Sequence, residues 1–355
     1  MSSTARPQPQ PLSTAASLFR SRRVHLAALV VLLLATPVFS IAFGAASVPL
    51  DQVFGVLADH LGIHPATGMD PITDAIVWQN RMPRIIAGIG VGAVLGVSGV
   101  ALQAVVRNPL AEPYVLGVSA GASSGAATAI IIVGVSSTLG VAGLAFAGAL
   151  VATFMVLAIG GRRRSTALTL VLAGLAIGFI FQAVTNLIIF SSDSPETARS
   201  VMFWTLGSLS KVGWTQSVWT VVVAAALIAM LWLCAPWLDA LASGDATSLS
   251  VGINPATIRL TILIPVSAAI GLVVAMAGGI GFVGLVIPHL MRSFTGYRHR
   301  TLVISSGLAG AVFLVWADTF SRTVFSPSEL PIGVITGLFG APFLLALVGR
   351  MNPAR

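Results

Sequence analysis

The sequence predicts an all-α integral membrane protein with about ten transmembrane helices. Of its 355 residues, 56% are hydrophobic and only 8% are charged, whereas roughly a quarter of the residues in soluble domains are charged. Apolar stretches of about 20 residues, the length that crosses a bilayer, recur along the chain. Most arginines stand at the ends of these stretches, where positive charge marks the membrane boundary.

The chain begins with a stretch rich in Pro and Ser that ends in three closely spaced arginines. We expect residues 1–23 to form a disordered cytoplasmic tail, because such a composition cannot bury enough apolar surface to fold. Residues 24–46 then form the first predicted span. A cleaved signal peptide is the alternative, since residues 43–46 are rich in small side chains, but the apolar stretch is longer than a signal core.

Nine further apolar stretches follow, so residues 24–350 form one predicted transmembrane domain. They cover residues 83–106, 114–134, 139–159, 167–190, 214–235, 260–277, 281–297, 301–321 and 331–349. Residues 260–290 are uncharged over 31 residues, which would make a helix of about 46 Å, too long for a bilayer core of roughly 30 Å. Because Gly278, Gly279 and Gly281 interrupt this stretch, we expect two spans there.

The distribution of charge orients the spans. With ten spans and both termini in the cytoplasm, the cytoplasmic segments hold most of the arginines and the external segments hold most of the acidic residues, including Asp51, Asp59 and Asp70. The net charge of +8 could suggest a nucleic-acid partner. We expect none, because the arginines do not gather on one face or in one tail.

A short internal similarity predicts an inverted repeat. Residues 117–121 (Gly-Val-Ser-Ala-Gly) resemble residues 333–337 (Gly-Val-Ile-Thr-Gly), and a segment with Glu and Pro precedes each, once in the cytoplasm and once outside. Spans two to five and seven to ten would then be two four-helix units of opposite orientation, a design common in transporters. Glycines spaced by four, at Gly88, Gly92 and Gly96, predict closely packed helices.

Several motifs and residue patterns are absent from the sequence, and their absence argues against some classes of function. No Gly-x-x-x-x-Gly-Lys-Ser/Thr loop occurs, so any ATP drive must come from a partner chain. No cysteine or histidine pair has metal-ligand spacing, and we predict no bound metal and no cofactor in this chain. The span centres lack the ionisable residues that an ion-coupled carrier or a membrane enzyme usually keeps. Asp318 and Arg322, four residues apart at a span end, are interpreted as a structural salt bridge.

Residues 239–259 form a cytoplasmic segment that is longer than a simple connection requires. Apolar Leu241, Leu249 and Val251 alternate there with polar residues. Such a segment could place short amphipathic helices in a groove of a soluble partner. The alternative is a surface loop without a partner.

Several motifs are typical of one transporter family. They are residues 81–84 (Arg-Met-Pro-Arg), 107–113 (Arg-Asn-Pro-Leu-Ala-Glu-Pro), 203–209 (Phe-Trp-Thr-Leu-Gly-Ser-Leu), 281–289 (Gly-Phe-Val-Gly-Leu-Val-Ile-Pro-His) and 329–334 (Glu-Leu-Pro-Ile-Gly-Val). Over residues 24–350 the chain resembles the permease subunits of the iron-siderophore, haem and vitamin B12 ABC importers, the FecCD type of type II importer.

The resemblance implies a transport subunit of the bacterial inner membrane that is not itself an enzyme. Its implied partners are a second permease subunit, two ATP-binding subunits that carry ATP and Mg, and an extracytoplasmic substrate-binding protein. We expect a homodimer, although a paralogous partner is the alternative. The expected function is inward movement of a ferric siderophore, or else haem or cobalamin, by alternating access. The competing hypotheses are an ion-coupled secondary transporter and, less simply, a lipid-embedded enzyme.

The resemblance also assigns site residues. Arg81, Arg84 and Arg322 match arginines that engage acidic residues of the binding protein, and such pairing makes physical sense. The alternative is that Arg81 and Arg84 extend to the membrane interface.

Within the coupling segment, we expect Gly252, Ile253 and Asn254 to contact the ATPase, whose closure would move the permease. The cytoplasmic gate of relatives matches Ser165, Thr166, Ala167 and Leu168. Ala167 and Leu168 depart there from the small polar residues of the family.

Overall fold

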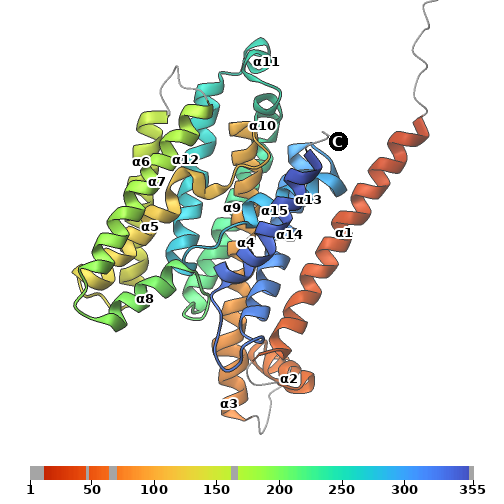
Figure 1. Ribbon diagram of the computed structural model, residues 1–355. Helices are drawn as coiled ribbons and strands as arrows, with labels where there is room; N and C mark the ends of the chain where they lie inside the picture. The colour runs from red at the N-terminus through yellow and green to blue at the C-terminus, as the bar shows by residue number, and fades with distance from the viewer. Residues whose placement is uncertain (1–11, 45–47, 64–69, 161–166, 352–355) are drawn as a thin grey trace, which may run out of the picture.

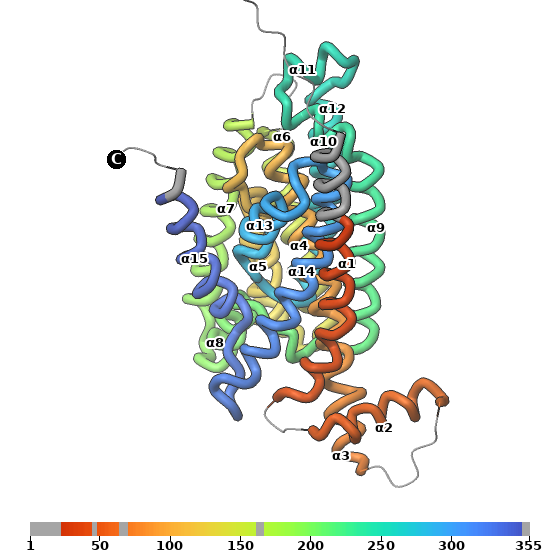
Figure 2. The backbone as a smooth tube through the Cα atoms, turned by 90° about the vertical axis from the view of Figure 1, so that its right-hand side faces the viewer, coloured from red at the N-terminus to blue at the C-terminus, as the bar shows by residue number. Residues whose placement is uncertain are grey.

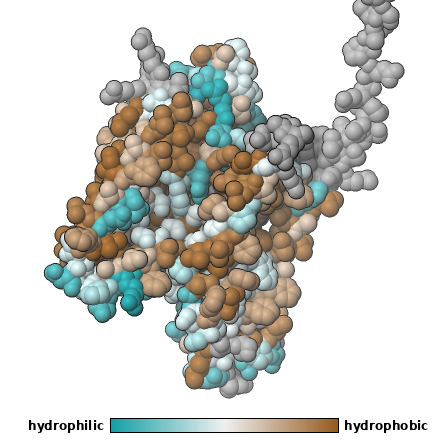
Figure 3. Space-filling view, viewed as in Figure 1, coloured by the Kyte–Doolittle hydropathy of each residue, from teal (hydrophilic) through white to brown (hydrophobic). Residues whose placement is uncertain are grey.

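A computed structural model describes residues 12–44, 48–63, 70–160 and 167–351, and the described segments contain helices and no strand. The predicted all-α fold class is confirmed. The helices form an elongated bundle, and α1 (Leu12–Ala42) lies along one flank (Figure 1). Hydrophobic side chains cover much of the visible flank of the bundle, while hydrophilic side chains gather mainly at its two ends (Figure 3).

Each of the predicted spans contains one long helix of the bundle. Besides α1, these are α4 (Met82–Val106), α5 (Val118–Ala127) with its continuation η3 (Thr128–Ile132), α6 (Thr138–Gly160), α7 (Ala167–Phe190), α9 (Trp214–Leu233), α12 (Pro255–Ala277), α13 (Val283–Thr295), α14 (His299–Ser321) and α15 (Ile332–Met351). Within the described residues, 8 helices are long and apolar enough to cross a membrane. The α5 segment with η3 (Val118–Ile132) is apolar but shorter, and α13 has only 13 residues.

Shorter helices occupy the two ends of the bundle, and they lie between the predicted spans. One end holds α2 (Leu50–His60), α3 (Pro71–Asp74) with η1 (Ala75–Arg81), and α8 (Pro195–Thr205), and the other holds α10 (Ala235–Ala242) and α11 (Asp245–Ser250) (Figure 1). A 3-10 turn, η2 (Pro113–Leu116), precedes α5.

The first helix differs from its prediction. Residues 12–23, which the sequence assigned to a disordered tail, belong to α1, and residues 1–11 lie outside the described part of the chain. The start of α1 and the end of α15 lie at the same end of the bundle as α10 and α11 (Figure 1). A chain that crosses the bundle an even number of times has both of its termini at the same end.

The predicted break after residue 277 is confirmed. Helix α12 ends at Ala277 and α13 begins at Val283, and the backbone between them passes through positive φ at Gly278 (71°) and at Phe282 (67°). A Cβ atom on Gly278 would collide with the carbonyl oxygen of Trp204. Glycine is therefore required at 278 both for the backbone conformation and for the close approach of the chain that precedes α9.

The packing of the long helices is reciprocal, as an inverted repeat requires. Helix α4 packs along α14 while α12 packs along α6, and α5 packs on α6 while α13 packs on α14 (Figure 2). Small residues allow these approaches, because a Cβ on Gly92 or Gly96 would strike the backbone of α14. This arrangement pairs α5 with α13, so the similarity between residues 117–121 and 333–337, which compares α5 with α15, does not follow the repeat.

Candidate docking and coupling sites at the two ends of the bundle

The three arginines predicted to dock a binding protein gather at the end of the bundle that carries α2 and α3. Arg81 closes η1, Arg84 lies in the first turn of α4, and Arg322 directly follows α14. Their side chains are almost fully enclosed, with exposed fractions of 4%, 3% and 4%. The alternative that Arg81 and Arg84 extend outward to a membrane interface is therefore wrong for this chain.

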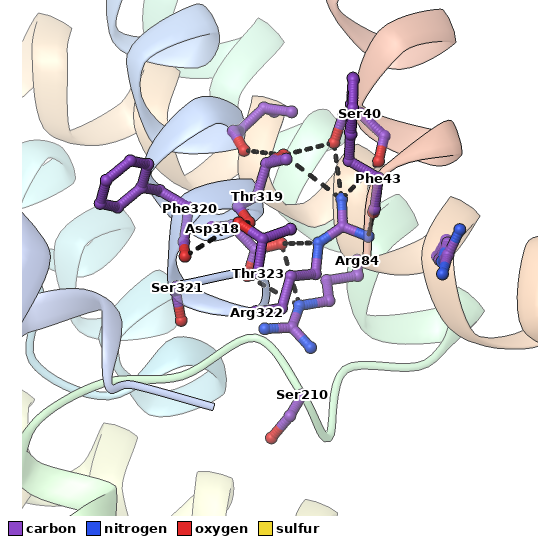
Figure 4. A network of polar contacts seen from close by, with 12 residues as sticks. Ser40, Phe43, Arg84, Ser210, Asp318, Thr319, Phe320, Ser321, Arg322 and Thr323 are labelled. Carbon is purple, nitrogen blue, oxygen red and sulfur yellow. Dashed lines mark hydrogen bonds and ion pairs between the residues drawn. The ribbon is translucent and has the colours of Figure 1, made fainter. Parts of the chain in front are cut away.

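Two carboxylates hold Arg84, those of Asp318 and Glu329, and Figure 4 shows the contact with Asp318. Its Nε donates to both carboxylate oxygens of Asp318, at 2.7 and 2.9 Å, and its Nη1 donates to both oxygens of Glu329, at 2.9 Å each. Asp318 is buried in the last turn of α14, whereas Glu329, in the segment before α15, is 39% exposed. Charge-assisted bonds of this kind are short and strong, so Arg84 links α4 to two later parts of the chain.

Arg322 makes a second set of contacts next to the first (Figure 4). Its Nη2 donates to the carbonyl and hydroxyl oxygens of Ser40, both at 2.7 Å, and its Nη1 donates to the carbonyl oxygen of Phe43 at 2.8 Å. Its Nε lies 3.4 Å from Asp318, which confirms the predicted salt bridge. Arg81 adds a hydrogen bond to the carbonyl oxygen of Ile41 at 2.5 Å.

These contacts define what we call the arginine network, comprising Arg81, Arg84, Asp318, Arg322 and Glu329. The network joins the end of α1 to α4, α14 and the segment that enters α15. Its guanidinium groups already have partners inside the chain, and Glu329 is the member that solvent reaches. A role in docking stays a prediction for the three arginines, and the geometry adds a structural role that the sequence did not show.

The predicted coupling segment folds into two short helices with an exposed tip. Gly252 adopts a positive φ of 78° and has open space around it, and the N–H of Ile253 returns to the carbonyl oxygen of Ser248 at 2.9 Å. Asn254 caps α12, since its side-chain oxygen accepts from the N–H of Ala256 at 3.1 Å. Beside this turn, Leu249 and Val251 are about 60% exposed, at 60% and 62%.

The predicted gate residues fall partly outside the described residues. Ser165 and Thr166 lie outside the described residues, whereas Ala167 and Leu168 are the first two residues of α7. Leu168 is exposed, while Ala167 packs against the core. Both lie at the end of the bundle that carries the coupling segment (Figure 1).

Helix α7 carries a pair of amide side chains that was not predicted from the sequence. Gln182 and Asn186 are both exposed on this apolar helix, and the Gln182 Nε2 donates to the Asn186 Oδ1 at 3.1 Å. The two amides stand at positions i and i+4 and share one helix face, a spacing in the sequence that could have predicted this polar site although neither residue is charged. The exposed face between Leu172 and Leu187 is otherwise apolar or small.

Polar contacts also fasten the break between α12 and α13. Tyr114 accepts from the N–H of Ile280 at 2.6 Å and donates to its carbonyl oxygen at 2.9 Å, and Glu112 accepts from the N–H of Phe282 at 2.5 Å. Burial raises the pKa of Glu112 above its ordinary value, and the hydrogen bond from Phe282 opposes this rise. The segment between α4 and α5 therefore supports the corresponding break of the second repeat unit.

The described residues contain no group of three or more His, Cys, Asp or Glu side chains placed to hold a metal ion. The chemistry at both ends of the bundle is that of ion pairs and hydrogen bonds between helices.

Comparison with known proteins agrees with this architecture. The model of the FecCD transport family matches residues 32–350. A Helicobacter pylori protein named "Probable iron chelatin transport system permease protein" is 39% identical over 275 residues, 78% of this chain and 82% of that protein. The vitamin B12 import system permease protein BtuC of Serratia proteamaculans is 37% identical over 308 residues, 85% of this chain and 90% of BtuC.

A solved inward-facing structure assigned to the metal-chelate type of ABC transporter shares the fold. It has a TM-score of 0.79 and 29% sequence identity, and the match covers 92% of this chain and 98% of the solved chain. The similarity extends over the spans, the coupling segment and the segment around Glu329. The chain belongs to the FecCD transport family and is a multi-pass permease of an ABC transporter.

Proposed function

We propose that this permease moves a bulky metal chelate inward by alternating access, driven by two separate ATP-binding subunits that carry ATP and Mg. A ferric siderophore is the first candidate cargo, followed by haem and cobalamin. Relatives named for iron chelatin and for vitamin B12 support this range. The chain would not alter its cargo chemically, and an extracytoplasmic binding protein would deliver it.

The amide pair on α7 is the observation that carries this proposal. A polar amide exposed on a helix in lipid lacks the hydrogen bonds that water supplies, which costs free energy. Gln182 and Asn186 satisfy each other only in part, since each amide can make further hydrogen bonds. The α7 face is therefore better placed toward a water-filled path, and a second copy of the permease would close the other side of that path.

The charge distribution supports one orientation in a bacterial inner membrane. The end with α10 and α11 would face the cytoplasm, together with both termini, because arginine-rich segments favour that side. The arginine network would then lie on the external side and face the binding protein. An acidic group of that protein would approach through Glu329, the exposed member, and compete for Arg84.

The tip of the coupling segment is the proposed ATPase contact. Gly252, Ile253 and Asn254 form a turn, and the exposed Leu249 and Val251 supply apolar surface beside it. Exposed apolar side chains at a helix tip fit a groove of a soluble partner. Residues 165–168 stay the proposed gate, and Ala167 and Leu168, the two of them that the structure describes, begin α7.

Cysteine cross-linking tests the shared path. The sequence has one cysteine, Cys234, so Cys234→Ser gives a background into which Asn186→Cys is introduced. We expect a cross-linked permease dimer in membranes. Val31→Cys, on α1 at the opposite flank, is the matched control and should stay monomeric (Figure 1). A dimer through Val31 and none through Asn186 would reject this face as the interface.

Uptake into proteoliposomes tests the driving force. The permease is reconstituted with its copurifying ATPase and binding protein, and radioactive ferric siderophore is supplied with or without ATP and without an ion gradient. ATP-dependent uptake supports the importer, and competition by haem or cobalamin ranks the cargo. Uptake that ignores ATP and follows an imposed ion gradient would instead establish the secondary transporter.

A further inference from the structure

One carboxylate of the coupling segment contacts both repeat units. Asp245 opens α11, and the Nη2 of Arg259 in α12 donates to its two oxygens at 2.7 and 3.0 Å. The Nη2 of Arg107, which ends α4, lies 3.7 Å from the same Oδ1 atom. Helices α4 and α12 are the first helices of the two units of the inverted repeat. Asp245 is thus an ion-pair bridge between the units, located at the base of α11.

The two sides of α11 have different roles in the fold. On one side, Ser248 is buried, and its hydroxyl donates to the carbonyl oxygens of Ala240 and Gly244, which fixes α11 against α10. On the other side, Leu249 and Val251 are exposed. A force applied to the exposed side of α11 is transmitted to the bundle through the polar contacts at the start of this helix. The charged contacts among them are the ion pairs of Asp245.

Arg107 extends the connection into the first unit. It adopts a positive φ of 55° at the end of α4 and begins the segment whose Glu112 and Tyr114 hold the break between α12 and α13. Arg259 is held in the second unit and is mostly enclosed, with 13% of its side chain exposed. Movement of Asp245 therefore acts on both units of the inverted repeat.

We propose that Asp245 is a positioning residue for energy coupling, which delivers the movement of the ATPase-bound α11 to α4 and α12 together. This inference rests on the proposed ATP-driven function. Asp245 is 41% exposed and Arg107 is 39% exposed, and ion pairs in such surroundings contribute little to folding. The bridge is accordingly suited to transmit motion at a low cost in stability when it is broken and remade.

The test measures uptake per ATP hydrolysed in proteoliposomes that contain the whole complex. Asp245→Asn should lower this ratio about fivefold while the ATPase still copurifies and hydrolyses ATP, since residues on a coupling route change coupling by that order. Asp245→Glu, which keeps the charge, should recover most of the ratio. A general loss of folding would reduce assembly and would not separate uptake from hydrolysis.

Asp239→Asn is the matched control. Asp239 lies in the same segment and is similarly exposed at 46%, and its carboxylate contacts His299 of α14, at 2.6 Å from the ring Nδ1. This variant should keep the ratio within about twofold. An equal loss in both variants would reject the specific role of Asp245.

A double-mutant cycle tests the bridge itself. Arg107→Gln should lower the ratio alone but should add little to Asp245→Asn, because Asp245→Asn already weakens the Arg107 ion pair that Arg107→Gln removes. Independent, multiplying effects would overturn the bridge. A wild-type complex without ATP-dependent uptake would overturn the proposed function instead, whereas a normal ratio for Asp245→Asn in a working complex would overturn this inference alone.

Discussion

The two ends of the bundle use the same residue types in opposite ways. At the end with α2 and α3, Arg84 and Asp318 are almost completely buried, and every charged pair in the arginine network involves an enclosed guanidinium group. At the other end, Asp245 and Arg107 are partly exposed. Buried charges need fixed partners because the loss of one partner leaves an uncompensated charge, whereas exposed charges exchange partners with water. The end with α2 and α3 therefore keeps its buried charges in fixed pairs, whereas Asp245 and Arg107 at the other end can also interact with water.

The largest difference is expected when the buried carboxylate is neutralised. Asp318→Asn removes the charge that faces both Arg84 and Arg322, and it should lower the stability of the permease by about 3–5 kcal/mol. Thermal unfolding in detergent measures the loss. Asp70→Asn, an exposed carboxylate at the same end, is the control and should change stability little. Equal melting temperatures for the two variants would contradict the structural role of the network.

A smaller effect is expected at the exposed member of the same network. Glu329→Gln removes one partner of Arg84 but leaves Asp318 in place, so the loss in stability should be about 1 kcal/mol. If acidic groups of the binding protein compete for Arg84, the same variant should bind that protein more tightly. Binding is measured by surface capture at low and high salt. Weaker binding at both salt concentrations would show that Glu329 itself is part of the docking surface.

The smallest effect is expected at the other end. Arg259→Gln breaks the hydrogen bonds to Asp245 and should change stability by about 0.5 kcal/mol, because Asp245 retains water and Arg107. Unfolding in detergent, in parallel with Asp318→Asn, checks the ratio of the two effects. A loss as large as that of Asp318→Asn would remove the contrast between the ends.

Much of the architecture could be predicted from the sequence. A helix in lipid must be almost entirely apolar, so its ends can be predicted from the hydrophobicity of the sequence. The predicted spans 139–159 and 167–190 agree with α6 and α7 to within one residue at each end. The break at Gly278 was also legible, because a stretch too long for the bilayer contains adjacent glycines. The short helices α2 and α8 were not predicted as elements, since helices of this length depend on what they pack against, whereas short helices were expected in residues 239–259.

The site residues show which features could not be predicted from the sequence. Charge position and motif selected Arg84 and Arg322, but nothing local shows that Arg84 binds Asp318 and Glu329, which lie 234 and 245 residues away. Likewise, the sequence contains Gln182 and Asn186 but does not show that their face of α7 is left uncovered. The sequence by itself determined the membrane fold, the spans and the family, because hydrophobicity and local backbone preference act over short distances. Only the tertiary structure decided which buried charges pair and which helix faces stay exposed, because both depend on how distant helices pack.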